Sequence, residues 1–379
     1  MKKSIKNIAV AMILGTASTM AFAAPHDSGA LDSGFRKGAA YTVEDDVYTL
    51  MNVNDWKKLQ FTNMFGFIDI DGTGDSGNFA VATHLKNKDV LGLAWEGNTW
   101  SDNSDNTFSG FYGWTNKAVK VYITEQTSDA GKISGVPGTA ANYKNFGLGG
   151  LFGMNVNEKI AFNAGLGLDF ASADVTATTG LASAESKANV TNFALTGTLI
   201  YTFKEAKDLT VKGYAFYDGL YGSVKTETEV GSTKIDAKTG TGVTDFGVGV
   251  KAQYKPTSLF TYGFYLECPW TASVTTPEKG DAVKSCVWQL EMGNGLSFTL
   301  KPEKFYMNLG LLTYFPSITK VDDNDATFGN FSNSYCGGLT FLVTPEIRID
   351  LSALITPEEG ISFDDVWTQK FNISLRAKF

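Results

Sequence analysis

The sequence predicts an all-β chain that crosses a membrane as an antiparallel up-and-down β-barrel. Three features predict it: an alternating strand at the C-terminus, an export signal at the N-terminus, and a regular alternation of short and long connections. In residues 366–379 the apolar side chains share one parity: Trp367, Phe371, Ile373, Leu375, Ala377 and Phe379. Polar residues fill the other parity, apart from the break at Gln369, so this strand has one apolar face and one wet face.

The chain ends on the apolar residue Phe379, next to a carboxylate that must stay in water. This ending resembles the C-terminal assembly signal of Gram-negative outer-membrane β-barrel proteins, although Ala377 stands where that family often has an aromatic residue. The resemblance implies that Phe371, Ile373, Leu375 and Phe379 are recognised by the barrel-assembly machinery. It also implies that the chain resides in the cell outer membrane, surrounded by its lipid.

The N-terminus has the pattern of a cleaved signal peptide. Lys2, Lys3 and Lys6 precede an apolar run at 8–14, and Ala21 and Ala23 supply the small residues that a signal peptidase reads. The apolar run is shorter than the roughly 20 residues that a spanning helix needs. We therefore expect residues 1–23 to be a signal peptide, and we expect the exported chain to enter a membrane as strands.

The connections between alternating segments fall into two kinds. Short polar turns are predicted at 86–88, 115–117, 155–158, 204–208, 255–258, 301–304 and 344–346. Longer Gly, Ser, Thr and Asp-rich loops are predicted at 98–107, 126–141, 172–188, 222–242, 271–283, 317–332 and 356–365. Short and long connections that alternate in this way are typical of the periplasmic and extracellular rims of bacterial barrels.

This spacing predicts about 16 strands, with residues 59–70 as the first strand and Leu59, Phe61, Phe65 and Phe67 on its apolar parity. Fourteen strands is the alternative, because the patterns at 108–114 and 119–125 are short. The predicted organisation is a signal peptide at 1–23, an N-terminal periplasmic or plug segment at 24–57, and a transmembrane barrel at 58–379.

Aromatic residues are predicted to form one girdle at each rim, as in other membrane barrels. The extracellular girdle would contain Trp95, Trp270, Trp288 and Trp367. The periplasmic girdle would contain Trp114, Tyr201, Phe203, Tyr254, Phe305 and Phe379.

The lumen parity carries charges of both signs. The candidate lumen charges are Asp169, Lys212, Asp245, Lys251, Glu267, Glu291, Arg348, Asp350, Lys370, Arg376 and Lys378. Glu267 and Glu291 could be read as a catalytic carboxylate pair, but with lysine and arginine on the same parity a solvated network is the favoured interpretation. Many other lumen positions are Gly, Ala, Ser or Thr, which leaves room for water or for inward-folded loops.

Two of the three cysteines flank one predicted extracellular loop. Cys268 and Cys286 lie on neighbouring strands of an exported chain, which allows a disulfide between them. A register shift of two residues would separate them, so both outcomes stay open. Cys336 lies on the lumen parity.

Enzymatic, metal and nucleic-acid functions are poorly supported. His26 and His84 are the only histidines, so an acid/base or nucleophile constellation is not expected, and neither is a cofactor. The formal net charge of −8 disfavours nucleic acid as a partner. Asp69, Asp71 and Asp75 form a weak calcium candidate that lacks the later glutamate of a helical calcium loop, and an acidic turn is the default.

The leading functional hypothesis is a passive, porin-like channel for small solutes. The alternatives are a structural or adhesive surface protein with a closed barrel, and a channel for hydrophobic substrates that resembles the outer-membrane fatty-acid channels. The Asn-Pro-Ala signature of the hatch in those channels is missing, as is the Pro-Glu-Phe-Gly-Gly signature of general porins.

Overall fold

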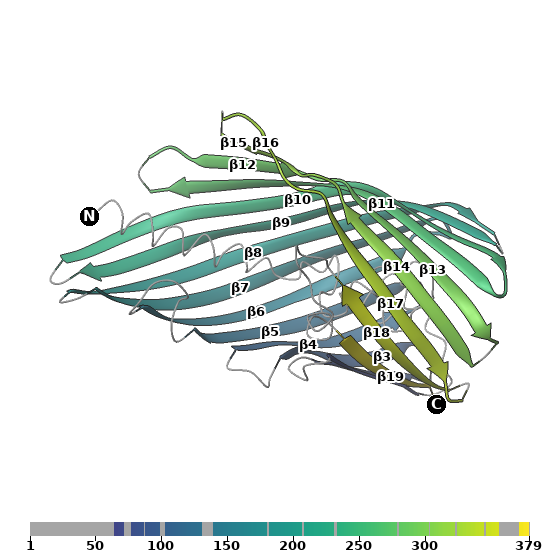
Figure 1. The fold of residues 1–379 in the computed structure, drawn as a ribbon. Helices are drawn as coiled ribbons and strands as arrows, with labels where there is room; N and C mark the ends of the chain where they lie inside the picture. Colours follow the sequence, from purple (N-terminus) through teal and green to yellow (C-terminus); the bar gives the residue numbers. More distant parts are fainter. Residues whose placement is uncertain are drawn as a thin grey trace.

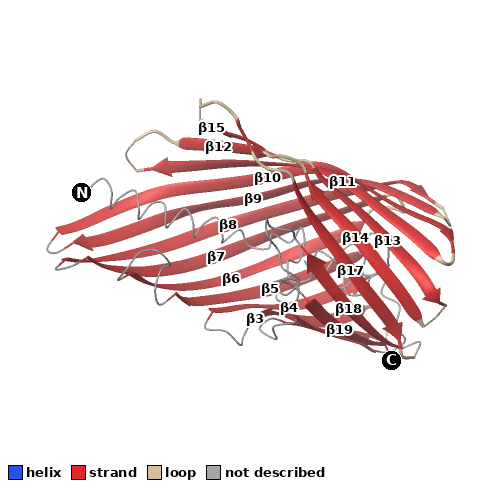
Figure 2. Cartoon of the chain, in the orientation of Figure 1, coloured by secondary structure: helices blue, strands red, loops and turns tan. Residues whose placement is uncertain are grey.

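A computed structural model describes residues 64–71, 77–86, 88–98, 103–130, 139–179, 182–206, 208–230, 233–278, 280–302, 304–322, 324–344, 346–355 and 371–378. Every regular element in these ranges is a strand (Figures 1 and 2). The segments are β1 Met64–Asp71, β2 Gly77–His84, β3 Val90–Asn98, β4 Asn103–Trp114, β5 Lys117–Ala130, β6 Thr139–Asn155, β7 Ile160–Thr179, β8 Ala182–Glu205, β9 Leu209–Val230, β10 Thr233–Thr257, β11 Phe260–Pro277, β12 Val283–Trp288, β13 Glu291–Lys301, β14 Phe305–Tyr314, β15 Ile318–Val321, β16 Thr327–Phe328, β17 Ser332–Leu342, β18 Ile347–Ile355 and β19 Phe371–Lys378. No described helix is long and apolar enough to cross a membrane.

The strands form one antiparallel sheet whose two ends meet. Consecutive strands pair with one another, and β1 also pairs with β19, so the hydrogen-bonded ring is closed. β11 pairs with β13 along its first half and with β12 along its second half. In the same way, β14 pairs with β13 and β15 with β12, and then β17 pairs with β14 and β16 with β15. The six segments β12 to β17 are therefore three interrupted barrel strands, namely β12 with β13, β14 with β15, and β16 with β17. The nineteen described segments thus form sixteen barrel strands, which confirms the predicted number.

The strands differ greatly in length around the ring. β1, β2, β18 and β19 have 8 or 9 residues, whereas β8 and β10 have 24 and 25. At about 3.3 Å per residue, β10 is about 80 Å long, far more than a tilted strand needs to cross a bilayer. The sheet from β6 to β11 therefore projects well beyond the shorter side of the barrel (Figure 1).

Four predicted long loops are wrong, because most of their residues are in strands. The loop expected at 98–107 lies mostly in β3 and β4, and the loop expected at 271–283 lies mostly in β11 and β12. The other two form this projecting sheet. The loop expected at 172–188 is occupied by the end of β7 and the start of β8, and the loop expected at 222–242 by β9 and β10. These residues are rich in Thr, Ser, Ala and paired charges. Such a strand is polar on much of both faces, so it lacks the apolar alternation that identifies a strand within lipid.

All seven predicted short turns lie between paired strands at the same end of the barrel. The described part of the first strand is Met64–Asp71, residues 59–63 of the expected strand lie outside the described residues, and the facing of the strand differs from the expectation. Met64 and Ile68 are exposed on the outer side, while Phe67 pairs with Ala80 in the inward register. The expected outward parity of Phe65 and Phe67 is therefore wrong. The pairing with β2 decides the facing, because directly opposite residues share one side of a sheet.

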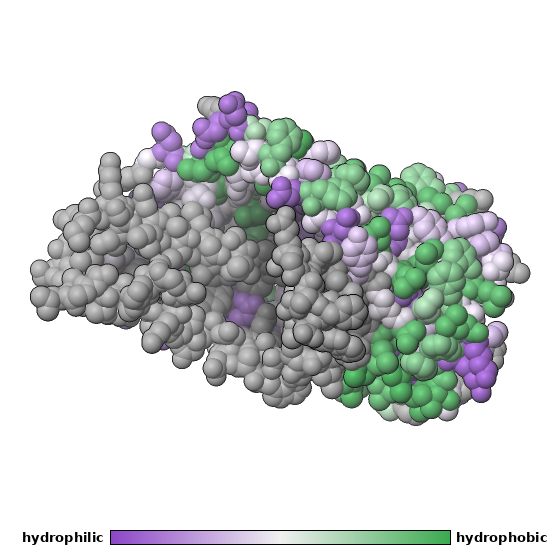
Figure 3. All heavy atoms as spheres, in the orientation of Figure 1, coloured by the Kyte–Doolittle hydropathy of each residue, from purple (hydrophilic) through white to green (hydrophobic). Residues whose placement is uncertain are grey.

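The outer surface is apolar between two bands of aromatic residues. Figure 3 shows hydrophobic side chains gathered at the turn end of β13, β14 and β17, where Leu300, Leu309 and Val343 are exposed. Ring stacking joins Tyr112 to Trp114 and Phe305 to Phe341 at this end, and Phe246 to Trp270 at the other. The two predicted girdles are thus present in the described chain, while Trp367 and Phe379 lie outside the described residues.

Candidate channel lining

The inner face of the barrel is polar, in contrast to the outer face. Along β7, Leu166, Leu168 and Phe170 are exposed on the outside, while Gly165, Gly167 and Asp169 alternate with them and are buried on the inside. The same alternation places Lys120, Asn192, Thr196, Asp218, Ser297, Asn308, Thr340 and Asp350 on the inner face, where all of them are buried. The strand period of two therefore produces a hydrogen-bonding wall from an ordinary amphipathic pattern.

The strongest concentration of polar side chains is the tyrosine–glutamate cluster, which consists of Tyr214, Lys251, Tyr265, Glu267 and Glu291 on β9, β10, β11 and β13. The Tyr214 hydroxyl donates to Glu267 Oε2 at 2.5 Å, and the Tyr265 hydroxyl donates to Glu291 Oε1. Lys251 Nζ lies 4.9 Å from the centre of the Tyr214 ring. Glu267 and Glu291 are directly opposite each other, so the tyrosine donors and the lysine offset the repulsion between their charges.

Glycines on the neighbouring strands make room for these rings. A Cβ atom added at Gly249 would lie closer than 3.0 Å to the Tyr214 ring, and one added at Gly293 would lie equally close to the Tyr265 ring. The same relation holds between Gly247 and Phe216. Each ring therefore lies against the wall over a glycine, where it is almost fully buried.

Gly293→Ala is expected to destabilise the refolded barrel by about 1–3 kcal/mol, because the new methyl group must displace the Tyr265 ring. The matched control is Gly66→Ala, since no atom lies within 4 Å of the added methyl group there. Urea unfolding in lipid vesicles would measure both variants. Equal stability of the two would show that the ring does not depend on the glycine.

A second polar region covers β5 to β9. The Thr196 hydroxyl donates to Asp218 Oδ1, and Asp169 lies in one rung with Gly147 and Asn192. Lys120 and Asp169 are only 7% and 6% exposed. The Thr124 hydroxyl oxygen and Asn145 Oδ1 are buried without a hydrogen-bond partner in the described chain. Other protein atoms therefore cover this part of the inner wall.

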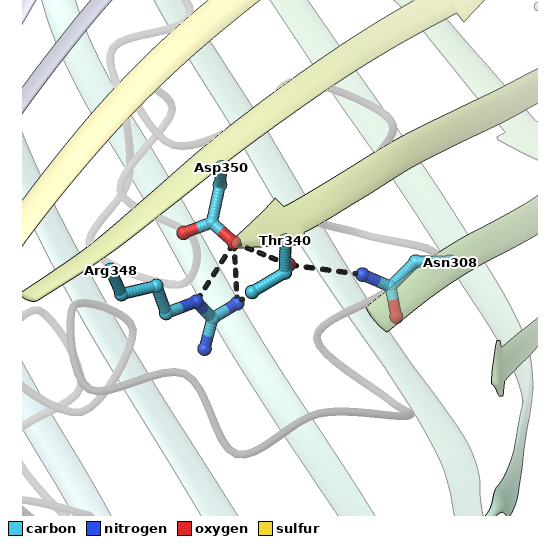
Figure 4. A network of polar contacts seen from close by, with 4 residues as sticks. All are labelled: Asn308, Thr340, Arg348 and Asp350. Carbon is cyan, nitrogen blue, oxygen red and sulfur yellow. Dashed lines mark hydrogen bonds and ion pairs between the residues drawn. The ribbon is translucent and has the colours of Figure 1, made fainter. Parts of the chain in front are cut away.

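A third network joins β14, β17 and β18 (Figure 4). Arg348 Nη2 lies 2.7 Å from Asp350 Oδ1, and Arg348 Nε donates to the same oxygen at 2.8 Å. The Thr340 hydroxyl donates to that oxygen at 2.5 Å and accepts from Asn308 Nδ2 at 3.4 Å. The charged pair is thus fixed to two neighbouring strands.

The candidate lumen charges that lie within the described residues all occupy strand positions that face the inside of the barrel. Asp169 and Asp350 are buried, and Lys212, Asp245, Lys251, Glu267, Glu291 and Arg348 are half-buried. The backbone places Arg376 and Lys378 in the inward register of β19, while Lys370 lies outside the described residues. Of the predicted assembly signal, Ile373 and Leu375 are exposed on the outer face and Phe371 begins β19.

The possible disulfide is not formed, and both cysteines are free. Cys286 is opposite Ala272, four residues along β11 from Cys268. That offset separates the two cysteines by about 13 Å along the strand, well beyond the reach of a disulfide. Cys268 Sγ instead accepts a hydrogen bond from Trp288 Nε1 at 2.8 Å. The sequence shows that both cysteines face outward but does not fix the register of the hairpin.

The weak calcium candidate does not form a loop in the described chain. Asp69 and Asp71 are in β1, where they pair with Ser374 and Asn372 of β19, and Asp75 lies outside the described residues. No group of three or more His, Cys, Asp or Glu side chains that could hold a metal ion is found in the described ranges.

Sequence reasoning missed the inward tyrosines. Tyr122, Tyr214 and Tyr265 alternate with apolar outward residues and look like girdle aromatics by composition. The sequence feature that marks an inward tyrosine is a glycine directly opposite it on the adjoining strand, as in Gly149 opposite Tyr122 and Gly293 opposite Tyr265. That signal becomes readable only when the register of both strands is known.

Comparisons with known proteins identify the fold. No protein-family model and no curated protein matches the sequence. A Pseudomonas aeruginosa FadL homologue is similar in structure, with 11% identity, a TM-score of 0.50, and coverage of 90% of this chain and 96% of that chain. The fold is that of an outer-membrane β-barrel protein.

Two further solved structures align with less similarity. The Ralstonia pickettii toluene transporter TbuX is 9% identical, with a TM-score of 0.45, over 90% of this chain and 97% of that chain. The CymD monoaromatic hydrocarbon channel is 10% identical, with a TM-score of 0.43, over 91% and 97%.

Proposed function

We propose that this barrel is a passive channel for small solutes in the outer membrane, reached by export through a cleaved signal peptide at residues 1–23. The observation that carries this proposal is the closed ring of sixteen strands with a hydrogen-bonding inner face. Barrels of about this size enclose an aqueous channel, whereas smaller ones are filled by their own side chains. The half-buried charged members of the tyrosine–glutamate cluster, Lys251, Glu267 and Glu291, then supply the polar surface that a permeating solute meets.

A second candidate is a channel for hydrophobic substrates. It is favoured by four apolar side chains that are buried in the inward register among the polar ones: Phe111, Leu151, Phe216 and Leu312. An aqueous pore does not require such residues, whereas an apolar solute would find contact surface along them. The two candidates differ in cargo and share the barrel.

The buried inner wall also supports a gate. Lys120, Asp169 and Asn192 face the lumen but are at most 7% exposed, which supports a lumen that is filled in part. An unobstructed pore would leave such side chains open to water. We assign this role to the N-terminal segment 24–57, which precedes β1 at the end of the barrel where the short turns lie. Permeation then requires this segment to move or to leave a path beside it.

The decisive experiment is single-channel recording of the refolded mature chain in a planar bilayer. We expect discrete current steps, and larger ones after deletion of residues 24–57. Vesicle swelling with sugars would support the aqueous channel, and uptake of a small aromatic hydrocarbon without swelling would support the hydrophobic one. If neither the full chain nor the deletion variant passes ions, sugar or hydrocarbon, the channel proposal is wrong and the structural or adhesive alternative takes its place.

A further inference from the structure

The outward face of the projecting sheet carries a row of positive charges close to the membrane. The register across β6 to β10 aligns five outward residues, which we call the basic rung: Lys144, Ser172, Asn189, Lys225 and Lys238. The three lysines and Asn189 are exposed. Their outward facing follows from Phe146, Phe193 and Tyr221, which share their parity on β6, β8 and β9 and are exposed in the apolar belt.

The basic rung lies just beyond the aromatic band. Lys144 is two residues from Phe146, Asn189 is four from Phe193, and Lys225 is four from Tyr221. With about 3.3 Å per residue and a strand tilt of about 40°, these offsets correspond to about 5–10 Å along the membrane normal. This is the depth of the polar headgroups, which form a layer of several ångströms on each side of the hydrocarbon.

The charges of the basic rung are balanced only in part within the described chain, because Glu278 lies opposite Lys238 at the same level. Lys225 and Lys238 are directly opposite each other on β9 and β10, an arrangement that is destabilising for like charges. Neither they nor Lys144 have an ion-pair partner among the described residues. The nearest recorded carboxylate contact is Glu278 Oε2, which accepts from the backbone N–H of Lys238 at 3.2 Å.

The rungs on either side have a different chemistry. Toward the membrane, the next rung contains Phe146, Phe170, Thr191 and Ser223. Away from the membrane, the next rung contains Asp174, Lys187, Glu227 and Asp236, in which acids predominate. The positive charge is therefore confined to one narrow level, between an aromatic and hydroxyl level below and an acidic level above.

We propose that the basic rung binds the phosphate groups of the phosphorylated glycolipid that forms the outer leaflet, the lipid A part of lipopolysaccharide. Lys225 and Lys238 hold one phosphate between them, so the anion removes the repulsion that the chain leaves in place. Lys144 and Asn189 lie within the same rung for a second polar contact, and the acyl chains pack on Phe170, Phe193 and Tyr221. This inference depends on the barrel spanning the outer membrane and not on whether its lumen conducts.

The test measures binding of bisphosphorylated lipid A and of the same lipid without phosphates to the full-length mature chain in detergent, by native mass spectrometry. We expect the wild type to prefer the phosphorylated lipid. The double variant Lys225→Gln/Lys238→Gln is expected to bind it about 25-fold more weakly, about fivefold for each lysine. Lys225→Arg/Lys238→Arg keeps the charges and is expected to retain most of the preference.

The control is Lys159→Gln/Lys255→Gln, which removes two exposed lysines at the turn end of the barrel. Equal loss in this control would show a net-charge effect and overturn the proposal, as would equal affinity of the wild type for both lipids. A second measurement needs no lipid. In lipid-free detergent the Lys225→Gln/Lys238→Gln variant is expected to melt at the same or a higher temperature than the wild type, since it removes a like-charge pair; a lower Tm would assign the lysines a structural role instead.

Discussion

Leu166→Lys is expected to destabilise the folded barrel by about 2–4 kcal/mol, because it places a charge on the lipid face near the middle of the bilayer. Leu166 is in β7, midway between the outward aromatic residues Phe162 and Phe170, and its side chain is 56% exposed on the outer face. The cost arises from moving an ammonium group from water into hydrocarbon, and a lysine at mid-depth is far from either interface. Urea titration of the variant refolded in lipid vesicles would measure it.

Thr198→Lys is the matched control. Thr198 is on β8 at a similar depth, but it faces inward and pairs with Asn163 and Phe216. A lysine there can extend along the polar wall, so we expect less than half of the loss seen for Leu166→Lys. The opposite order of stability would mean that the inner and outer faces have been exchanged, and the channel proposal would lose its basis.

The part of the fold inside the membrane could be predicted from the sequence because lipid enforces a strict alternation. Residues such as Leu166, Leu168 and Phe170 must be apolar there, and the polar residues between them must face inward. The seven short turns and the sixteen strands follow from this alternation. Outside the membrane that constraint ends, so alternation does not identify the extensions of β7 to β10 as strands.

The candidate site was predictable in composition and not in detail. The inward charges follow from parity alone, as for Asp169 and Asp350. Which of these charges contact one another depends on the register between strands. Alternation shows which residues face inward, but registers that differ by two residues have the same alternation. The same limit explains the cysteines, because a shift that keeps both of them outward still separates Cys268 from Cys286.

Glycine positions carry the register information that the charges lack. Gly249 and Gly293 are where Tyr214 and Tyr265 lie against the wall, and those rings then direct their hydroxyl groups to Glu267 and Glu291. A shift of two residues would keep every inward residue inward. In one direction it would place Lys251 or Glu291, each with a Cβ atom, opposite the ring, whereas in the other direction it would place Gly247 or Gly295 there. The glycines therefore disfavour a slip in one of the two directions and leave the other open.

The ion pair between Arg348 and Asp350 should behave asymmetrically when either partner is replaced. The Asp350 side chain is 5% exposed and that of Arg348 is 20% exposed. Arg348→Met is expected to cost about 3–5 kcal/mol, because a buried carboxylate then lacks its guanidinium partner. Asp350→Asn is expected to cost less, about 1–3 kcal/mol, because the arginine can turn toward water and the amide can still accept from the Thr340 hydroxyl.

The double variant Arg348→Met/Asp350→Asn completes the cycle. It removes both charges, so its cost should fall below the sum of the single costs by about 0.5–3 kcal/mol. Unfolding free energies of all four proteins in one lipid composition would give the coupling. Costs that add to within about 0.5 kcal/mol would show that the two residues do not interact. A coupling in the expected range would instead show that the two charges on β18 stabilise each other at the carboxylate oxygen to which Thr340 of β17 is bound directly and Asn308 of β14 through one hydroxyl.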